Sequence, residues 1–231
     1  MPILHLKYSY LFGVLLSLIP WGLLFFHRRD LRREMLVMSM LVVMAGITAE
    51  AIWYTADWVK PETISGTPVG IEDIILSWGA GGVGAVLYEE FFKHRTYKRL
   101  RKKTNHLLDF LIPVLIFWIV TSVAFWALKL HSFTANMLGF ASATIYIYLR
   151  RPDLIPNSLA TGILGVIFWV PCYLLVFTLF PGFSEGYWQW GKLSGITLLG
   201  IPIEDYIWWI GAGAVIGPFY EFWQGLRIVE E

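Results

Sequence analysis

The sequence is poor in cysteine and in charged residues. Cys172 is the single cysteine among 231 residues, so the chain cannot form an internal disulfide. Only 15% of its residues are charged, whereas about a quarter are charged in an ordinary soluble domain. Hydrophobic residues make up 57% of the chain. These proportions exclude a disulfide-bonded scaffold and argue against a soluble globular domain.

Several motifs that would indicate a particular chemistry are also missing. The five histidines are scattered and show no HExxH or similar spacing, so we expect no metal site. The sequence contains no GxSxG nucleophile elbow and no Cys/His arrangement for nucleophilic catalysis. The last apolar run contains no lysine. A retinal Schiff base of the kind that seven-helix photoreceptors form there is therefore not supported.

Long apolar runs alternate with short charged segments. Most of the runs reach the roughly 20 residues that a helix needs to cross a bilayer, although the fifth is short. The pattern predicts an all-α integral membrane protein with seven transmembrane helices. We expect these helices at residues 6–26, 35–57, 72–92, 107–128, 134–149, 159–180 and 204–223.

Lysine and arginine are concentrated on one side of this predicted topology. All but four of the 18 lie on the side of the first, third and fifth connecting loops and the C-terminus. Because cytoplasmic loops are rich in these residues, we expect the N-terminus outside and the C-terminus in the cytoplasm. The basic stretch 93–103 fits a cytoplasmic loop facing anionic lipid better than a nucleic-acid site. The four exceptions are Lys7, Lys60, Lys129 and Lys192.

One acidic, glycine-rich sequence occurs twice. EDIILSWGAGGVGAVLYE (72–89) and EDYIWWIGAGAVIGPFYE (204–221) align without a gap, and both open with Glu-Asp and close with Tyr-Glu. Further upstream, FFHRRDL (25–31) resembles YLRRPDL (148–154). The repetition predicts two parallel three-helix repeats. We assign residues 1–96 to the first repeat, 97–130 to a basic loop and connector helix, and 131–231 to the second repeat.

The acids that open each copy are the first candidates for a functional site. Glu72, Asp73, Glu204 and Asp205 are predicted at the outer entry of the third helix of each repeat. Carboxylates are costly beside a bilayer, so a duplicated set indicates function, although acids in a first helical turn also suit the helix dipole. Glu50 is the most deeply placed acid and has no acidic counterpart in the second repeat. It is interpreted equally well as a proton donor or as a structural acid.

The glycines and aromatic residues support two further expectations. GAGGVG (79–84) matches the dinucleotide pattern GxGxxG but lies inside an apolar run, so we expect it to allow close helix packing. An aromatic face stabilises a cation, and some of the aromatic residues within the spans are candidates for lining an apolar cavity. Those candidates are Trp78, Tyr206, Trp208 and Trp209. Three tryptophans near span ends, Trp58, Trp188 and Trp190, are interpreted as a membrane-interface belt.

The second copy carries a resemblance to a known family. PIEDYIW (202–208) resembles the P-x-E-[DE]-x-x-[FW] signature of integral-membrane lycopene cyclases, in which each half has about three helices and one such motif. The first copy, GIEDIIL (70–76), keeps Glu72 and Asp73 but has Gly70 in place of proline and Leu76 in place of the aromatic residue. The resemblance implies a carotenoid end-group cyclase.

The resemblance also implies a mechanism. An acid would protonate the terminal double bond of a linear carotenoid such as lycopene, the ring would close, and a proton would leave without net redox change. This is the reaction of an isomerase or intramolecular lyase, and it needs no cofactor. Glu204 and Asp205 are the first candidates, followed by Glu72 and Asp73, with Glu50 in reserve. The enzyme would work in the lipid bilayer, as a homo-oligomer or in a complex with other carotenoid enzymes.

Three other functions fit the same features. A carotenoid hydratase would share the protonation step and then capture the cation with water. A small membrane transporter would use the repeats as its architecture and the acids as proton carriers. A carotenoid-binding protein would use the cavity without chemistry.

Overall fold

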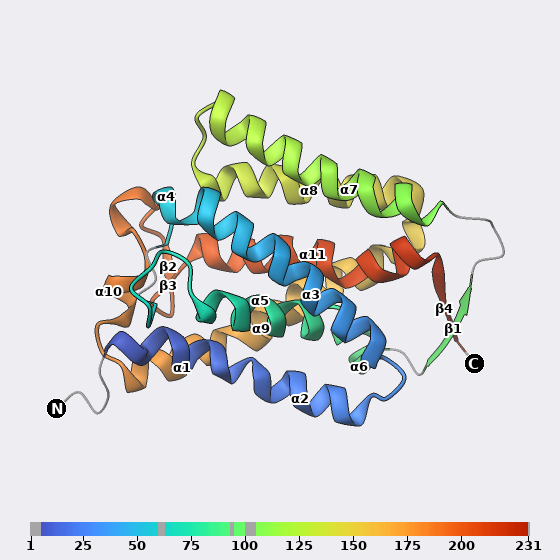
Figure 1. Cartoon of the computed structure of the whole chain (residues 1–231), viewed down its shortest axis with the longest axis horizontal. Coiled ribbons are helices and arrows are strands. Elements are labelled where there is room, and N and C mark those ends of the chain that lie inside the picture. The colour runs from blue at the N-terminus through green and yellow to red at the C-terminus, as the bar shows by residue number, and fades with distance from the viewer. Residues whose placement is uncertain (1–5, 60–62, 93–94, 100–104, 231) are drawn as a thin grey trace. The chain divides into compact units, whose positions relative to one another are not determined.

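A computed structural model describes residues 6–59, 63–92, 95–99 and 105–230, which are mostly helical (Figure 1). The chain divides into two compact units. Unit 1 consists of the described residues of Met1–Val83 and Val166–Ile207, and unit 2 consists of those of Gly84–Gly165 and Trp208–Glu231. Both units therefore take residues from both predicted repeats. Part of the basic stretch 93–103, as well as Lys60, lies outside the described residues.

Unit 1 contains the helices of the N-terminal region and the outer part of the second repeat. A π-helix, η2, continues α3 and begins at Glu50. The long helix α9 and the helix α11 each contribute one end to this unit. Its elements are η1 (Leu6–Tyr8), α1 (Ser9–Leu16), α2 (Leu18–His27), α3 (Arg32–Ala49), η2 (Glu50–Tyr54), α4 (Thr55–Asp57), α5 (Ile71–Gly84), α9 (Ile155–Leu179), α10 (Phe183–Tyr187), η5 (Trp190–Lys192), β2 (Thr197–Leu198), β3 (Ile201–Pro202) and α11 (Ile203–Gln224).

Unit 2 contains an antiparallel helix pair and the other ends of α9 and α11. Strand β1 pairs antiparallel with β4 near the C-terminus, with Tyr97 opposite Ile228. The short strand pairs β1–β4 and β2–β3 were not expected from the apolar pattern. The elements of unit 2 are α6 (Leu87–Phe92), β1 (Arg95–Arg99), α7 (His106–Ser122), η3 (Val123–Ala127), α8 (Ser132–Arg150), η4 (Pro152–Leu154) and β4 (Leu226–Glu230).

The predicted helical membrane class is confirmed, while the number of crossings stays a prediction. Each predicted apolar run is helical, but the third is interrupted between the end of α5 at Gly84 and the start of α6 at Leu87. Four helical segments within the described residues are long and apolar enough to cross a bilayer. They are Leu6–His27, Arg32–Asp57, His106–Ala127 and Pro152–Leu179.

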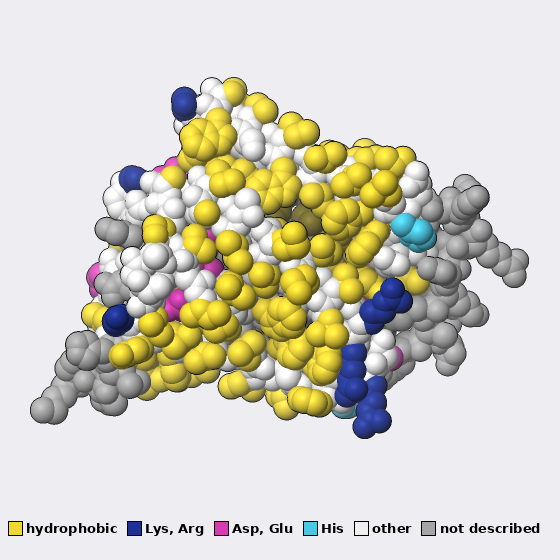
Figure 2. Space-filling view, in the orientation of Figure 1, with side chains coloured by type: hydrophobic (Ala, Val, Ile, Leu, Met, Phe, Trp, Pro, Cys, Tyr) yellow, Lys and Arg dark blue, Asp and Glu magenta, His cyan; other side chains and the backbone are white. Residues whose placement is uncertain are grey.

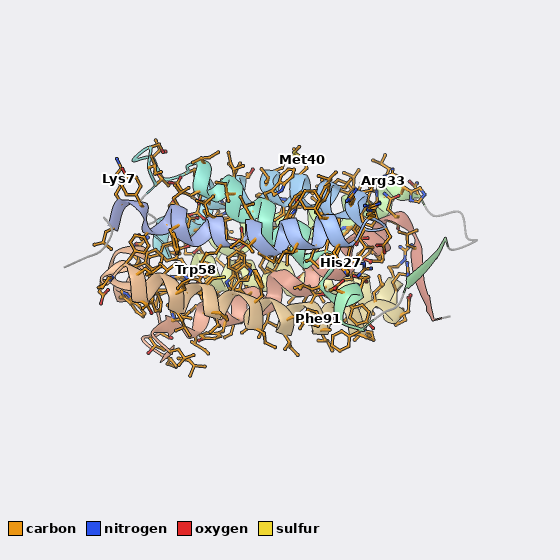
Figure 3. All side chains as sticks on the ribbon, turned by 90° about the horizontal axis from the view of Figure 1, so that it is seen from below. Lys7, His27, Arg33, Met40, Trp58 and Phe91 are labelled. Atoms are coloured by element: carbon orange, nitrogen blue, oxygen red, sulfur yellow. The ribbon has the colours of Figure 1, made fainter. Side chains whose placement is uncertain are left out.

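The surface of unit 1 separates apolar flanks from charged ends. Figure 2 shows hydrophobic side chains over α2 and α3, and Lys and Arg side chains where α2 turns into α3. Large apolar side chains on these helices are exposed, including Phe26 at 73% and Met44 at 64%. In Figure 3, Lys7 lies near one end of the α1–α2 segment and His27 near the other. An apolar flank between polar ends is the surface that a bilayer requires.

The glycine-rich stretch of α5 packs against neighbouring helices, as expected. A Cβ on Gly81 would lie 2.6 Å from the backbone oxygen of Met38 in α3, and one on Gly79 would overlap the Ser17 side chain. The stretch lies inside a helix and does not connect a strand to a helix, as a dinucleotide site would need. Its small residues therefore serve close helix packing.

Candidate active site

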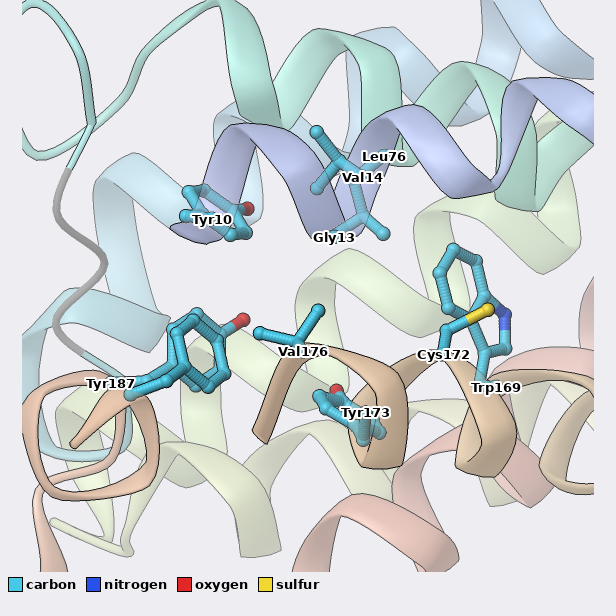
Figure 4. A pocket seen from close by; sticks show the side chains of 10 residues that line it. Tyr10, Gly13, Val14, Leu76, Trp169, Cys172, Tyr173, Val176 and Tyr187 are labelled. Carbon is cyan, nitrogen blue, oxygen red and sulfur yellow. The ribbon is translucent and has the colours of Figure 1, made fainter. Parts of the chain in front are cut away.

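A small apolar cavity lies in unit 1 among α1, α5, α9 and α10 (Figure 4). Its volume is about 30 Å³, which is room for roughly two water molecules. Three tyrosine hydroxyl groups are the main polar groups among its lining side chains. The lining residues are Tyr10, Gly13, Val14, Leu76, Trp169, Cys172, Tyr173, Val176, Phe183 and Tyr187.

Asp73 is connected to this cavity through Tyr10. The Tyr10 hydroxyl donates a hydrogen bond of 2.5 Å to Oδ1 of Asp73. The backbone N–H of Gly70 donates to Oδ2 of the same carboxylate at 2.7 Å. Asp73 is 3% exposed, so its contact with the cavity runs through the tyrosine that forms part of the wall.

Asp205 has the same arrangement in the second copy of the motif. Tyr173, which also lines the cavity, donates a hydrogen bond of 2.8 Å to Oδ2 of Asp205. The indole N–H of Trp188 donates to Oδ1 at 2.9 Å. Each motif aspartate therefore accepts one hydrogen bond from a cavity tyrosine and one from an N–H group. The first N–H belongs to the backbone of Gly70 and the second to the side chain of Trp188.

Glu72 and Glu204 instead hold the loops that precede their helices. Oε1 of Glu72 accepts the backbone N–H of Ile64 at 2.6 Å, and Oε1 of Glu204 accepts that of Ser194 at 2.7 Å. Oε2 is buried in both residues and has no hydrogen-bond partner among the described residues. The two members of each acidic pair thus make different contacts, which sequence reasoning did not distinguish.

Glu50 lies at the start of the π-helix η2 and is partly buried. Its Oε1 atom is inaccessible and has no hydrogen-bond partner within the described part of the chain. Departures from α-helical hydrogen bonding such as this π-helix occur frequently at functional sites. When FFHRRDL (25–31) is aligned with YLRRPDL (148–154), the residue that corresponds to Glu50 is Tyr173. The two halves of the site are therefore chemically unequal.

The hydroxyl group of Tyr187 is influenced by the charges of three acids, Asp205, Glu50 and Asp73. Burial raises the pKa of its hydroxyl group well above the usual value, and the charges of Asp205, Glu50 and Asp73 raise it further. Figure 4 shows Tyr187 across the cavity from Tyr10. Their ring centroids are 5.5 Å apart. A neutral tyrosine thus lies within electrostatic range of three carboxyl groups.

An aromatic cluster includes three residues that line the cavity, namely Tyr173, Phe183 and Tyr187. Trp188 is at its centre, with ring centroids 5.1 Å from Tyr187, 5.6 Å from Tyr173 and 6.2 Å from Phe183. The interpretation of Trp58 and Trp188 as a lipid-facing belt is wrong, because these side chains are only 4% and 3% exposed. Both residues lie near the end of a predicted span. That position in the sequence does not show whether a side chain points into the protein or toward lipid.

The aromatic residues predicted to bind substrate lie elsewhere in their units. Trp78 packs against Trp21 in unit 1, with ring centroids 5.7 Å apart. The Tyr206 hydroxyl donates to the backbone oxygen of Leu198. Trp208 and Trp209 belong to unit 2, where their rings form a T-shaped pair. None of the four is among the residues that line the cavity of unit 1, and their role stays a prediction.

These features define a class: a helical membrane protein with carboxylates and tyrosines around an apolar, aromatic cavity. Residues 130–223 match the model of the family described as Lycopene cyclase. This match confirms the resemblance seen in PIEDYIW (202–208) and supports a carotenoid cyclase-like function. Comparison with curated proteins and with solved structures finds no match. The matched region includes Tyr173, Trp188, Glu204 and Asp205.

Proposed function

We propose that the protein is a carotenoid end-group cyclase that acts at the cavity of unit 1. The observation that carries the proposal is the convergence of both motif aspartates on this cavity. Asp73 and Asp205 come from separate copies of the motif, and each is hydrogen-bonded to a tyrosine of the same apolar wall. An acid must meet an alkene in an environment without bulk water, and this arrangement supplies both.

The chemistry is an acid-catalysed isomerisation. A proton adds to the terminal double bond of a linear carotenoid end, and a tertiary carbocation forms. The neighbouring double bond attacks this cation and closes a six-membered ring. Loss of a proton then leaves a ring double bond. The rings of Tyr10 and Tyr187 line the cavity, and an aromatic ring can stabilise a cation through its quadrupole.

Within each acidic pair, the two residues are proposed to have different tasks. Asp73 and Asp205 carry charge and protons next to the cavity, because their tyrosine partners line it. Glu72 and Glu204 hold the outer loops in place by accepting backbone N–H groups. Both pairs are then required for ring formation, the aspartates for chemistry and the glutamates for position.

The seven-span, two-repeat architecture is proposed from contacts that recur in both halves. A Cβ on Gly213 would lie 2.9 Å from the backbone oxygen of Thr161, and these residues correspond to Gly81 and Met38 in the aligned repeats. The recurring contacts support repeats at 1–96 and 131–231 around a connector at 97–130. The lysine and arginine distribution supports an N-terminus outside and a C-terminus in the cytoplasm.

A second recurring contact supports the same relationship. Arg28 donates from Nε and Nη2 to the two carboxylate oxygens of Asp30. Arg151 donates from the same two nitrogens to the two oxygens of Asp153. Each of these two-bond pairs lies just before the second helix of its repeat.

The size of the cavity constrains how the substrate enters. About 30 Å³ does not hold a six-membered ring with its methyl groups, so binding requires the lining side chains to move apart. A carotenoid hydratase would share the first protonation but deliver water to the cation. The wall offers mostly hydrocarbon and aromatic surface, which favours ring closure over hydration.

Expression in a lycopene-accumulating host tests the proposal. The product expected is a cyclic isomer of the same mass as lycopene, identified by chromatography and mass spectrometry. A hydroxylated product heavier by one water would indicate the hydratase instead. Linear lycopene alone, with the protein present in the membrane fraction, would contradict cyclisation of this substrate.

A further inference from the structure

The two loops that precede the motif copies differ in character. In the loop before the first copy, the side chains of Thr63, Ser65 and Thr67 bond to one another and to nearby backbone oxygens. The loop before the second copy contains an antiparallel hairpin of β2 and β3. No residue between Lys192 and Glu204 carries a charge. Duplication of the motif therefore does not account for the hairpin.

The tip of this hairpin exposes three large apolar side chains. Ile196, Leu198 and Leu199 are 63%, 54% and 58% exposed, whereas Ile201 on the second strand is 1% exposed. A cluster of exposed large apolar side chains marks a contact with a membrane, a ligand or another protein. The hairpin thus has one residue packed inside the protein and an apolar tip directed away from it.

The turn at the tip contains a residue that its backbone geometry disfavours. Leu199 and Gly200 connect the paired residues Leu198 and Ile201, and their φ angles are 55° and 79°. A two-residue hairpin turn with two positive φ angles prefers Asn-Gly, Asp-Gly or Gly-Gly, because a bulky side chain is uncommon at positive φ. Leu199 is also exposed, so packing inside the protein does not explain a leucine at this position.

Hydrogen bonds fix the hairpin to the start of α11. The backbone N–H of Ser194, just before the hairpin, donates to Oε1 of Glu204 at 2.7 Å. The Tyr206 hydroxyl donates to the backbone oxygen of Leu198 at 2.9 Å. Both acceptor and donor side chains belong to the first turn of α11. The apolar tip is therefore held in its exposed position by the same helix that carries the second acidic pair.

The hairpin also lies against the apolar flank of α9. A Cβ on Gly200 would lie 3.4 Å from the ring of Phe177. Leu174 lies three residues before Phe177, on the same face of the helix, and is 37% exposed. Figure 1 shows β2 and β3 at the end of unit 1 where α10 also lies. The exposed tip is therefore continuous with the surface of a helix that is long and apolar enough to cross a bilayer.

We propose that the β2–β3 hairpin inserts Ile196, Leu198 and Leu199 into the lipid leaflet that surrounds the start of α11. Interfacial elements bury their apolar side chains about 5–10 Å into the boundary between headgroups and acyl chains, a depth that suits a tip at the end of a spanning helix. A second copy of the chain would also cover these side chains. Lipid is favoured because the apolar surface continues from the tip along α9. This inference does not depend on the cyclase function.

Fluorescence from one labelled cysteine tests the insertion. In a Cys172→Ser background, Leu199→Cys is labelled with the environment-sensitive dye NBD, and the protein is reconstituted into phosphatidylcholine vesicles. The emission should shift to the blue, and iodide in the water should quench it weakly. Acyl chains brominated near the headgroup should quench the dye at least roughly twofold more than chains brominated near their ends, because the insertion is shallow.

Ser65→Cys in the same background is the matched control. Ser65 is exposed in the polar loop before the first motif copy, so its dye should remain in water. The emission should then lack the blue shift, respond strongly to iodide and be insensitive to brominated chains. If Leu199→Cys does not accumulate as folded protein, Ile196→Cys places the dye at a second exposed position of the tip.

Two results would overturn the proposal. A dye at the tip that matches the Ser65 dye in emission and in iodide quenching would place the tip in water. Protection from iodide without quenching by brominated chains, lost when the protein is diluted in lipid, would assign the tip to a contact between copies of the chain. Neither result bears on ring formation, which the pigment composition of a lycopene-accumulating host tests separately.

Discussion

The indole N–H of Trp188 donates a 2.9 Å hydrogen bond to Oδ1 of Asp205, and both side chains are buried. Trp188 follows α10, whereas Asp205 lies in the first turn of α11. The contact ties the outer aromatic cluster to an acid of the PIEDYIW motif. It also makes the charge of Asp205 dependent on a residue outside that motif.

Replacement of Trp188 tests this dependence. Trp188→Phe keeps an aromatic ring but removes the donor to Asp205. A hydrogen bond to a charged group contributes about 1.5–3 kcal/mol, so ring formation should fall roughly tenfold or more. Initial rates of cyclisation in isolated membranes provide the measurement.

Trp190→Phe is the control for Trp188→Phe. The Trp190 indole donates to the backbone oxygen of Ser184, and its ring packs against Trp188. This variant should lose an indole hydrogen bond to a neutral acceptor without affecting Asp205. Equal rates for the Trp188 and Trp190 variants would contradict the role given to the Trp188–Asp205 contact.

The loop-anchoring role of Glu204 predicts a difference between two substitutions. The amide oxygen of Glu204→Gln can still accept the N–H of Ser194, so this variant should keep a substantial part of its cyclase activity. Glu204→Ala removes the acceptor and should lose most of it, since an unsatisfied buried N–H costs about 1–3 kcal/mol. Pigment composition at matched protein levels gives the comparison. Equal loss in both variants would indicate that Glu204 is itself the acid.

Glycine packing predicts a stability difference between two alanine variants. A Cβ on Gly81 would meet the Met38 backbone oxygen, and such overpacking costs about 1–3 kcal/mol. A Cβ on Gly22 has nothing within 4 Å, so Gly22→Ala should be neutral or stabilising, by up to roughly 1 kcal/mol. Thermal unfolding in detergent should show a lower midpoint only for Gly81→Ala. A midpoint for Gly81→Ala at or above the wild-type value would refute the close α3–α5 contact.

The helices were predictable from the sequence because their signal is local. Apolar runs bounded by charges mark the helical segments, and small residues inside such a run indicate packing, as Gly79 and Gly81 illustrate. The interruption after Gly84 was missed, because hydropathy continues unchanged through it. The π-helix at Glu50 was missed for a related reason, since a change in hydrogen-bond register alters neither composition nor periodicity.

The acids of the candidate site were predictable, but their partners were not. Duplication drew attention to Asp73 and Asp205, whereas Tyr10 lies 63 positions before the aspartate that it contacts. Nothing in the sequence near Tyr10 distinguishes it from other aromatic residues at a span end. The separate contacts of Glu72 and Asp73 also depend on side-chain direction within one helical turn, which the sequence pattern does not specify.

The central claim is that carboxylates from both motif copies act on one substrate at one cavity. The most direct measurement is the pigment composition of a lycopene-accumulating host that expresses the wild type, Asp73→Asn, Asp205→Asn or Glu185→Gln at equal membrane levels. The account predicts cyclic carotenoid in the wild type and in Glu185→Gln, and a loss of at least roughly 100-fold in each aspartate variant. Ring formation that survives at wild-type yield in either aspartate variant would contradict it.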